Sequence, residues 1–147
     1  MNVVAMGRFA EFVPQEMVEE LIQCAIDVQK NSYSPYSKYP VGAAILMESG
    51  KIFTGCNVEN AALGETICAE RSAITQAVSS GERNIKAVLI VLGEGGAPCG
   101  SCRQVINEFN PHAYIFSATS DGVLHNEWRL DELLPNSFGP KDLPHLA

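Results

Sequence analysis

Two short stretches, Cys68-Ala69-Glu70-Arg71-Ser72-Ala73 and Pro98-Cys99-Gly100-Ser101-Cys102, decide how this chain folds and what it can bind. They supply three cysteine thiolates, which can hold a zinc ion tetrahedrally and leave its fourth position for water. A carboxylate two residues from one ligand can then move the protons of that water. Alone, a CxxC motif also fits a redox site, a structural zinc knuckle or packed core cysteines. The combination favours a catalytic zinc site over these alternatives.

Apolar periodicity and turn residues predict alternating strands and helices around the two motifs. The expected order is a helix Pro14–Lys30, a hairpin of strands Val41–Met47 and Lys51–Asn57, a helix Ile67–Ser80, a strand Ile85–Leu92, a helix from Cys99 to before Pro111, strands His112–Ser117 and Val123–Trp128, a helical turn Asp131–Leu134 and an irregular tail. We therefore expect one domain over residues 1–147. Its fold class is α/β, a three-layer α/β/α sandwich with a mixed, mainly five-stranded sheet.

Cys68 and Cys99 both fall where a helix is expected to start after buried chain. The N-terminus of a helix favours negative charge and lowers the pKa of a thiol placed there. Two such helix ends side by side would form a thiolate site for a divalent cation. The Gly-rich loop Gly93–Ala97 does not suggest a phosphate site, because it lacks the Lys and Ser or Thr of a Walker motif.

The whole chain narrows the class of partner. It has 147 residues, 46% of them apolar, and a net charge of −7. An acidic chain without a basic run argues against nucleic acid and favours a small, uncharged substrate. The odd number of cysteines, five, does not suggest a disulfide framework. The mildly apolar stretch Met1–Val13 is interrupted by Gly7, Arg8 and Glu11, so we expect no signal peptide, no membrane span and a cytoplasmic location.

At this point the motifs identify a family. Over nearly its whole length the chain closely resembles the small homotetrameric, zinc-dependent cytidine deaminases of pyrimidine salvage. The resemblance rests on several motifs in the right order: Tyr33-Ser34-Pro35-Tyr36-Ser37, Pro40-Val41-Gly42-Ala43-Ala44, Gly55-Cys56-Asn57-Val58-Glu59-Asn60-Ala61, the two cysteine motifs, Glu132-Leu133-Leu134-Pro135 and Ser137-Phe138-Gly139-Pro140.

The resemblance implies a role for each site residue. Cys68, Cys99 and Cys102 would bind one Zn²⁺ per chain, and Glu70 would carry protons between the zinc-bound water, ring N3 and the leaving amine. It also implies homotetramers with shared active sites. The other implied roles are ribose binding by Asn57 and Glu59, reading of the pyrimidine amide edge by the backbone of Ala69, base packing by Phe138 of a neighbouring subunit, and hydrogen bonds from Arg71 to the zinc thiolates.

Local chemistry agrees with these roles and leaves alternatives open. Asn57 and Glu59 alternate along an extended segment, so they share one face, as a sugar diol requires; capping of a loop is the alternative. Arg71 can offset the excess negative charge of three thiolates around Zn²⁺, or it is a surface charge. Tyr39, like Tyr36, would line the pocket or pack within its loop.

We therefore expect hydrolytic deamination of cytidine and 2′-deoxycytidine to uridine and 2′-deoxyuridine, with release of ammonia. Leu63 stands where the family often has Tyr, and the Gly93–Ala97 loop is short. These departures keep open an enzyme for a modified, N4-substituted or antibiotic aminopyrimidine nucleoside. A zinc-stabilised binding module without catalysis is a further alternative, against which the intact Glu70 weighs.

Overall fold

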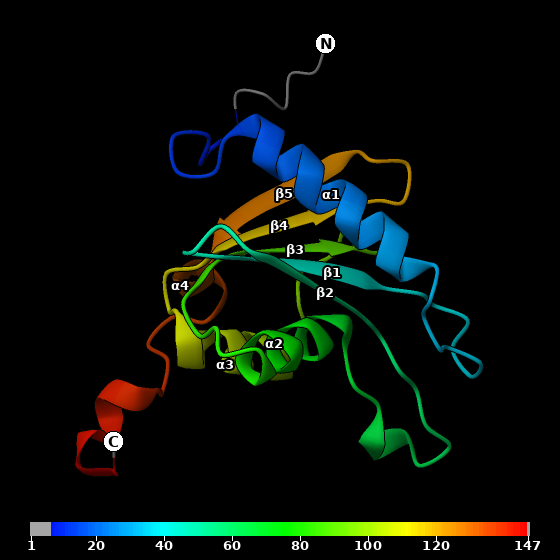
Figure 1. Cartoon of the computed structure of the whole chain (residues 1–147). Coiled ribbons are helices and arrows are strands. Elements are labelled where there is room, and N and C mark those ends of the chain that lie inside the picture. Colours follow the sequence, from blue (N-terminus) through cyan, green and yellow to red (C-terminus); the bar gives the residue numbers. More distant parts are fainter. Residues whose placement is uncertain (1–6, 147) are drawn as a thin grey trace.

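A five-stranded mixed sheet forms the centre of the molecule, with the strands in the order β2-β1-β3-β4-β5 (Figure 1). The computed structural model describes residues 7–146. Strands β3 and β4 pair in parallel and the other three pairs are antiparallel, which confirms the predicted mixed sheet. The strands are β1 Gly42–Met47, β2 Ile52–Cys56, β3 Ile85–Val91, β4 Tyr114–Ala118 and β5 Leu124–Arg129.

Helices cover both faces of this sheet, so the expected three layers are confirmed (Figure 1). The long helix α1 lies on one face, and α2 and α3 lie on the other. The helices are α1 Gln15–Gln29, α2 Ala69–Ser79, α3 Gly100–Phe109 and the single turn α4 Leu130–Leu133. Among residues 7–146, no helix is long and apolar enough to cross a membrane. The two ends of the expected domain 1–147, and Met1–Met6 of the stretch Met1–Val13, lie outside the described residues.

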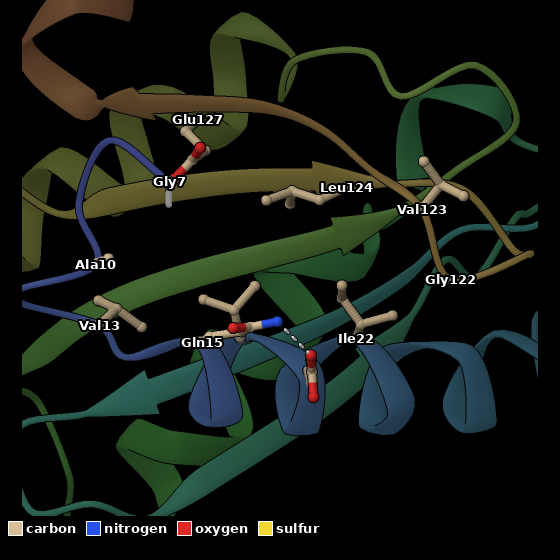
Figure 2. Close-up of a pocket in the computed structure, with 11 residues that line it drawn as sticks. Gly7, Ala10, Val13, Gln15, Ile22, Gly122, Val123, Leu124 and Glu127 are labelled. Atoms are coloured by element: carbon tan, nitrogen blue, oxygen red, sulfur yellow. Dashed lines mark hydrogen bonds between the residues drawn. The ribbon is translucent and has the colours of Figure 1, made fainter. Parts of the chain in front are cut away.

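On the α1 face, the helix packs its apolar stripe on the middle strands, with Leu21 and Ala25 fully buried. The segment before α1 extends this cover over β4, because the rings of Phe9 and Phe12 lie 4.9 and 5.3 Å from the ring of Tyr114. Between α1 and the β4–β5 hairpin remains a cavity of about 90 Å³ (Figure 2). None of the predicted site residues lines it.

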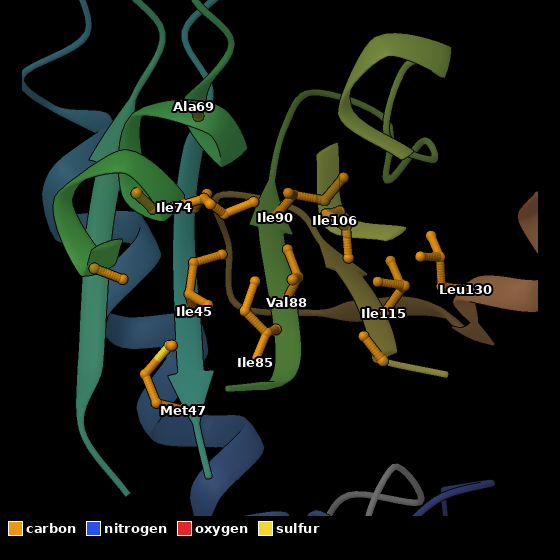
Figure 3. Packing of buried hydrophobic residues seen from close by; sticks show 14 residues of the cluster. Ile45, Met47, Ala69, Ile74, Ile85, Val88, Ile90, Ile106, Ile115 and Leu130 are labelled. Carbon is orange, nitrogen blue, oxygen red and sulfur yellow. The ribbon is translucent and has the colours of Figure 1, made fainter. Parts of the chain in front are cut away.

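The opposite face carries the larger part of the core and the two helices that bear the cysteine motifs (Figure 3). A fully buried aliphatic side chain stabilises the fold by about 1.5–3 kcal/mol relative to an exposed one. Several such side chains lie between the sheet and the α2–α3 layer, so both helices are firmly seated. They include Ile45, Ile74, Val88, Ile90, Ile106 and Ile115.

Helix α2 approaches β2 closely at Gly55. A Cβ atom at Gly55 would lie 2.5 Å from the backbone nitrogen of Ala73 and 2.8 Å from the backbone oxygen of Ala69. No side chain fits into this contact, so glycine allows the helix backbone to rest directly on the strand. The contact fixes the first turn of α2, and with it the positions of Cys68 and Glu70.

The structure differs from the predicted elements mainly at their ends. The strand expected from His112 begins at Tyr114, because Asn110 closes a turn by accepting hydrogen bonds at its backbone oxygen from Ala113 N and at Oδ1 from His112 N. The expectation of a wholly irregular tail is wrong, since Pro140–Asp142 and Pro144–Leu146 each form a 3₁₀ turn. Proline suits the first position of such a turn, where its missing N–H is not needed.

Candidate metal centre and active site

The three predicted cysteine ligands come together at the N-termini of two helices. Cys68 is the N-cap of α2, Cys99 is the N-cap of α3, and Cys102 lies in the first turn of α3. Their sulfur atoms all lie within 4.8 Å of one another, and the Sγ atoms of Cys68 and Cys99 are 3.8 Å apart. A tetrahedral zinc with bonds of about 2.3 Å requires sulfurs about 3.8 Å apart. The donor set therefore fits zinc in both chemistry and spacing.

Hydrogen bonds and charge prepare these sulfurs to bind a cation. Arg71 donates from Nη2 to Sγ of Cys68 at 3.4 Å, and the backbone N–H of Cys102 donates to Sγ of Cys99 at 3.4 Å. The neighbouring Cys102 thiol, assisted by Arg71, lowers the pKa of Cys68 to about 5. The same interaction with Cys68, together with burial, raises the pKa of Cys102. Cys68, next to the guanidinium, is thus the first of the pair to become a thiolate.

Glu70 is the one buried carboxylate among the residues that the structure describes, with only 4% of its surface exposed. It lies in the first turn of α2 and opens on the cavity beside the cysteines. Burial, reinforced by the charge on Cys68 and partly offset by Arg71, raises the pKa of Glu70 to about 7. A group that moves protons at neutral pH works best with a pKa near that pH.

A cavity of about 220 Å³ connects Glu70 with the cysteines on the α2–α3 side of the sheet. It brings together five of the residues predicted from the sequence. Two others lie just behind the cavity wall: Arg71 donates to the Cys68 sulfur, and Cys102 supplies the third sulfur of the cluster. Glu59, Tyr39 and Phe138 do not line the cavity of their own chain. The lining residues are Val41, Asn57, Thr66, Cys68, Ala69, Glu70, Ile90, Leu92, Ala97 and Cys99.

Asn57 and Glu59 share one face, as their alternation predicted, and that face meets the loop 32–41. The side-chain oxygen of Asn57 accepts from Val41 N at 3.0 Å and from the hydroxyl of Ser32, while its Nδ2 donates to the backbone oxygen of Tyr39 at 2.8 Å. Glu59 accepts from Tyr36 N at 3.0 Å and from the backbone and side chain of Ser37. Both residues therefore fix the loop, as the loop-capping alternative states, and Asn57 also lines the cavity.

Tyr39 and Phe138 lie outside the cavity of their own chain. Tyr39 is 43% exposed, and a side chain on Gly93 would meet its hydroxyl at 3.2 Å, so its ring rests on the Gly93–Ala97 loop. Phe138 is 60% exposed, although its backbone oxygen is held by the side chains of Gln104 and Asn107 at 2.9 and 3.2 Å. The structure thus presents a large aromatic ring to solvent on a fixed backbone.

Sequence reasoning missed part of the wall and one residue behind it. Thr66 lines the cavity two residues before Cys68 in extended chain, so the alternation already used for Asn57 could have found it. Arg103 donates from Nε to the backbone oxygen of Pro98 at 2.8 Å and from Nη1 to that of Leu133 at 2.9 Å. It anchors the residue before Cys99, and its place directly after the CxxC motif was the available signal.

Comparison with known proteins agrees with this geometry. A family model described as the cytidine and deoxycytidylate deaminase zinc-binding region matches residues 15–118. A cytidine deaminase of Sporosarcina psychrophila is 44% identical over 133 residues, which cover 88% of this chain and 97% of the relative. The chain therefore belongs to the cytidine and deoxycytidylate deaminase family.

Solved structures place the fold within the same group. The crystal structure of cytidine deaminase from Burkholderia pseudomallei superposes with a TM-score of 0.77 at 38% identity, covering 81% of this chain and 97% of that one. Cytidine deaminase from Mycobacterium tuberculosis gives a TM-score of 0.71 at 36% identity, covering 82% and 95%. Both relatives are cytidine deaminases and are matched over almost their whole length.

Proposed function

We propose that this protein is a zinc-dependent hydrolase that converts cytidine and 2′-deoxycytidine to uridine and 2′-deoxyuridine and releases ammonia. One observation carries the proposal: the buried carboxyl of Glu70, with its pKa near 7, opens on the same cavity as the sulfur cluster. A zinc ion held by Cys68, Cys99 and Cys102 supplies, when bound, the Lewis acidity that makes water a nucleophile at neutral pH.

The protein's own contribution to the reaction is proton transfer by Glu70. As its carboxylate, Glu70 takes one proton from the attacking water and gives it to N3 of the pyrimidine while the oxygen bonds to C4. It then carries the second proton to the exocyclic amine, the C4–N bond breaks, and ammonia leaves. Water has thus supplied the carbonyl oxygen, the N3 proton and the third hydrogen of ammonia, and Glu70 returns to its starting state.

The cavity walls would hold and orient the base. Ile90 and Val41 offer flat apolar surface to the ring, which is how most small-molecule pockets bind their ligands. Ala69 begins α2, and the first N–H groups of a helix have no partner within the helix. One of them can donate to the pyrimidine amide edge. The volume of about 220 Å³ leaves the sugar toward the mouth, next to Asn57.

Asn57 and Glu59 each keep a free hydrogen-bonding position for a ribose hydroxyl, even though both hold the loop 32–41. Asn57 has two N–H groups on Nδ2 and uses one of them. Glu59 has about four acceptor positions, of which three accept from Tyr36 and Ser37. One donor and one acceptor remain. Each can still bond to a sugar hydroxyl, so loop capping does not exclude sugar binding by the same side chains.

We further propose a homotetramer whose active sites are shared, with Phe138 of one subunit packing near the base bound by another. Its exposed ring on a fixed backbone supports this arrangement, because aromatic residues are enriched at protein interfaces relative to the rest of the surface. Tyr39 and Leu63, which are 43% and 70% exposed, would be covered in the same way. Sedimentation of an active monomer at assay concentration would rule out shared sites.

No specific observation favours the N4-substituted nucleosides. The short Gly93–Ala97 loop leaves less empty space than its composition suggests, since the Tyr39 ring covers Gly93 and the His125 side chain packs on Gly95. A binding module without catalysis has no need of the buried, cavity-facing Glu70. We also propose a cytoplasmic location, because thiolates that bind a metal fit a reducing compartment.

The test is an ultraviolet assay of cytidine, 2′-deoxycytidine, cytosine, CMP and N4-methylcytidine. We expect turnover of the first two. The Glu70→Gln variant should keep its zinc and its fold but lose several orders of magnitude in kcat, whereas Glu108→Gln, an exposed carboxylate on α3, should behave like the native protein. Near-native turnover by Glu70→Gln, or an inactive native protein with full zinc, would contradict the proposal.

A further inference from the structure

The loop Gly93–Ala97 connects β3 to the helix that carries two of the cysteines, and it is held at one central carbonyl. The backbone oxygen of Gly95 accepts a hydrogen bond from the hydroxyl of Ser117 at 2.7 Å and another from Nδ2 of Asn126 at 2.6 Å. Asn126 Nδ2 also donates to Ser117 Oγ at 3.3 Å. Three groups from three segments therefore meet at one point beneath the loop.

The sheet register explains why these two side chains reach the loop. Ser117 on β4 pairs with Ile90 on β3 and with Asn126 on β5, so the three residues form one row across the sheet. Ile90 lines the cavity, so this row starts at the candidate active site. Ser117 is fully buried in a strand whose other buried residues, Ile115, Phe116 and Ala118, are apolar. A buried hydroxyl in such a strand costs stability unless it is hydrogen-bonded, and Gly95 supplies its partner.

The backbone of Gly95 is adapted to this contact. It has a φ angle of +68°, which favours glycine, and a Cβ atom there would lie 2.7 Å from Cβ of His125. The loop thus rests directly on β5 at Gly95, and Tyr39 covers it from the other side at Gly93. Two residues later, Ala97 lines the cavity next to Cys99. The position of Gly95 therefore sets the position of this wall.

We infer that Ser117 and Asn126 are positioning residues that fix the Gly93–Ala97 loop and thereby limit the space beside the exocyclic amine of the substrate. The inference rests on the proposed function. The amine is bonded to the carbon that the water attacks, so it must lie close to the sulfur cluster, where Ala97 and Cys99 form the wall. Neither side chain touches the substrate. Both act through the backbone of the loop, and loosening it should admit a larger group on N4.

The test compares the binding of two nucleosides by calorimetry, so that it does not depend on turnover. Uridine carries only a carbonyl oxygen on C4, and N4-methylcytidine carries the larger methylamino group there. In the zinc-loaded protein, Ser117→Ala and Asn126→Ala should each raise the ratio of the uridine Kd to the N4-methylcytidine Kd by about tenfold, because one methylene that a pocket rejects or accepts changes discrimination by about 10–200-fold. Asn126→Asp keeps the size of the side chain but loses the donor, so it should behave like Asn126→Ala.

Controls separate positioning from a general loss of structure. Ser120→Ala removes a hydroxyl from the tip of the same hairpin, where it contacts Gln29 instead of the loop, and should leave the ratio unchanged. The inference is wrong if the Ser117 and Asn126 variants keep the native Kd ratio. It is also wrong if they lose zinc and bind both nucleosides more weakly by the same factor. A native protein that binds these nucleosides but does not deaminate cytidine would contradict the proposed function alone. A native protein that binds neither would contradict both.

Discussion

The substitution Gly55→Ala tests whether the contact between β2 and α2 holds the site in place. The added Cβ would lie 2.5 Å from Ala73 N, about 0.9 Å short of the 3.4 Å at which ordinary contact begins. The three nearest atoms are Ala73 N, Ala69 O and Ser72 Cβ. All three move only with the helix backbone, so α2 must move. Overpacking of this kind costs about 1–3 kcal/mol, which for a chain of this size lowers Tm by about 3–10 °C.

The movement should also be visible in catalysis, because the first turn of α2 carries Cys68 and Glu70. A displacement near 1 Å reduces turnover by up to about 100-fold. The assay combines thermal unfolding with kcat/KM for cytidine. Gly64→Ala is the matched control, since nothing lies within 4 Å of a Cβ there and the same loss of conformational entropy in the unfolded chain applies. If both variants keep native Tm and activity, the close contact does not position the site.

Three further predictions concern the thiolates and the surface charges. Cys99→Ala should purify without stoichiometric zinc, and its zinc affinity should fall by more than the roughly 10–100-fold that removal of an outer-shell partner costs. Full zinc content by mass spectrometry would exclude Cys99 as a ligand. Arg71→Gln should weaken zinc binding about 10–100-fold in a chelator competition, because the hydrogen bond to Cys68 is lost; unchanged affinity would make Arg71 a surface charge. Arg129 lowers the pKa of Asp131, so this carboxylate stabilises the fold above its unfolded pKa of about 3.9 and ceases to do so as pH falls through the lowered folded value. Asp131→Asn should therefore cost about 0.2–1 kcal/mol at pH 7 and nothing near pH 2 in urea unfolding; equal costs at both pH values would contradict the pairing.

The sequence predicted the three layers, the succession of strands and helices along the chain and the three cysteines of the metal site, because each is carried by a local pattern or motif. Cys68 and Cys99 are the N-caps of α2 and α3, close to where helix starts were expected. The expectation of buried chain before Cys68 is wrong, since Ile67 is 44% exposed and the residues before it lie at the surface. The roles of the loop partners could not be predicted in the same way. Whether Asn57 holds a loop, lines a cavity or does both depends on Val41 and Tyr39, which only the tertiary structure brings to it.

The same limit applies to the residues behind the site. Ser117 reads as one polar residue near the end of an apolar strand, and its contact with Gly95 crosses 22 positions of the chain. The bulk around the Gly-rich loop could not be predicted from its composition either, because Tyr39 and His125 come from distant segments to pack on it. Parts of the site assembled from several segments require the register of the sheet, which the sequence specifies only through the complete fold.

The most direct test of the central claim, an open three-cysteine zinc site served by Glu70, is zinc X-ray absorption of the purified protein. We expect one zinc per chain with three sulfur ligands at about 2.3 Å and one oxygen or nitrogen ligand at about 2.0–2.1 Å. The fourth ligand should be exchangeable, so the absorption spectrum should change when a nucleoside binds in the cavity. Four sulfur ligands would mean a closed structural site, and would contradict the claim that this zinc performs chemistry.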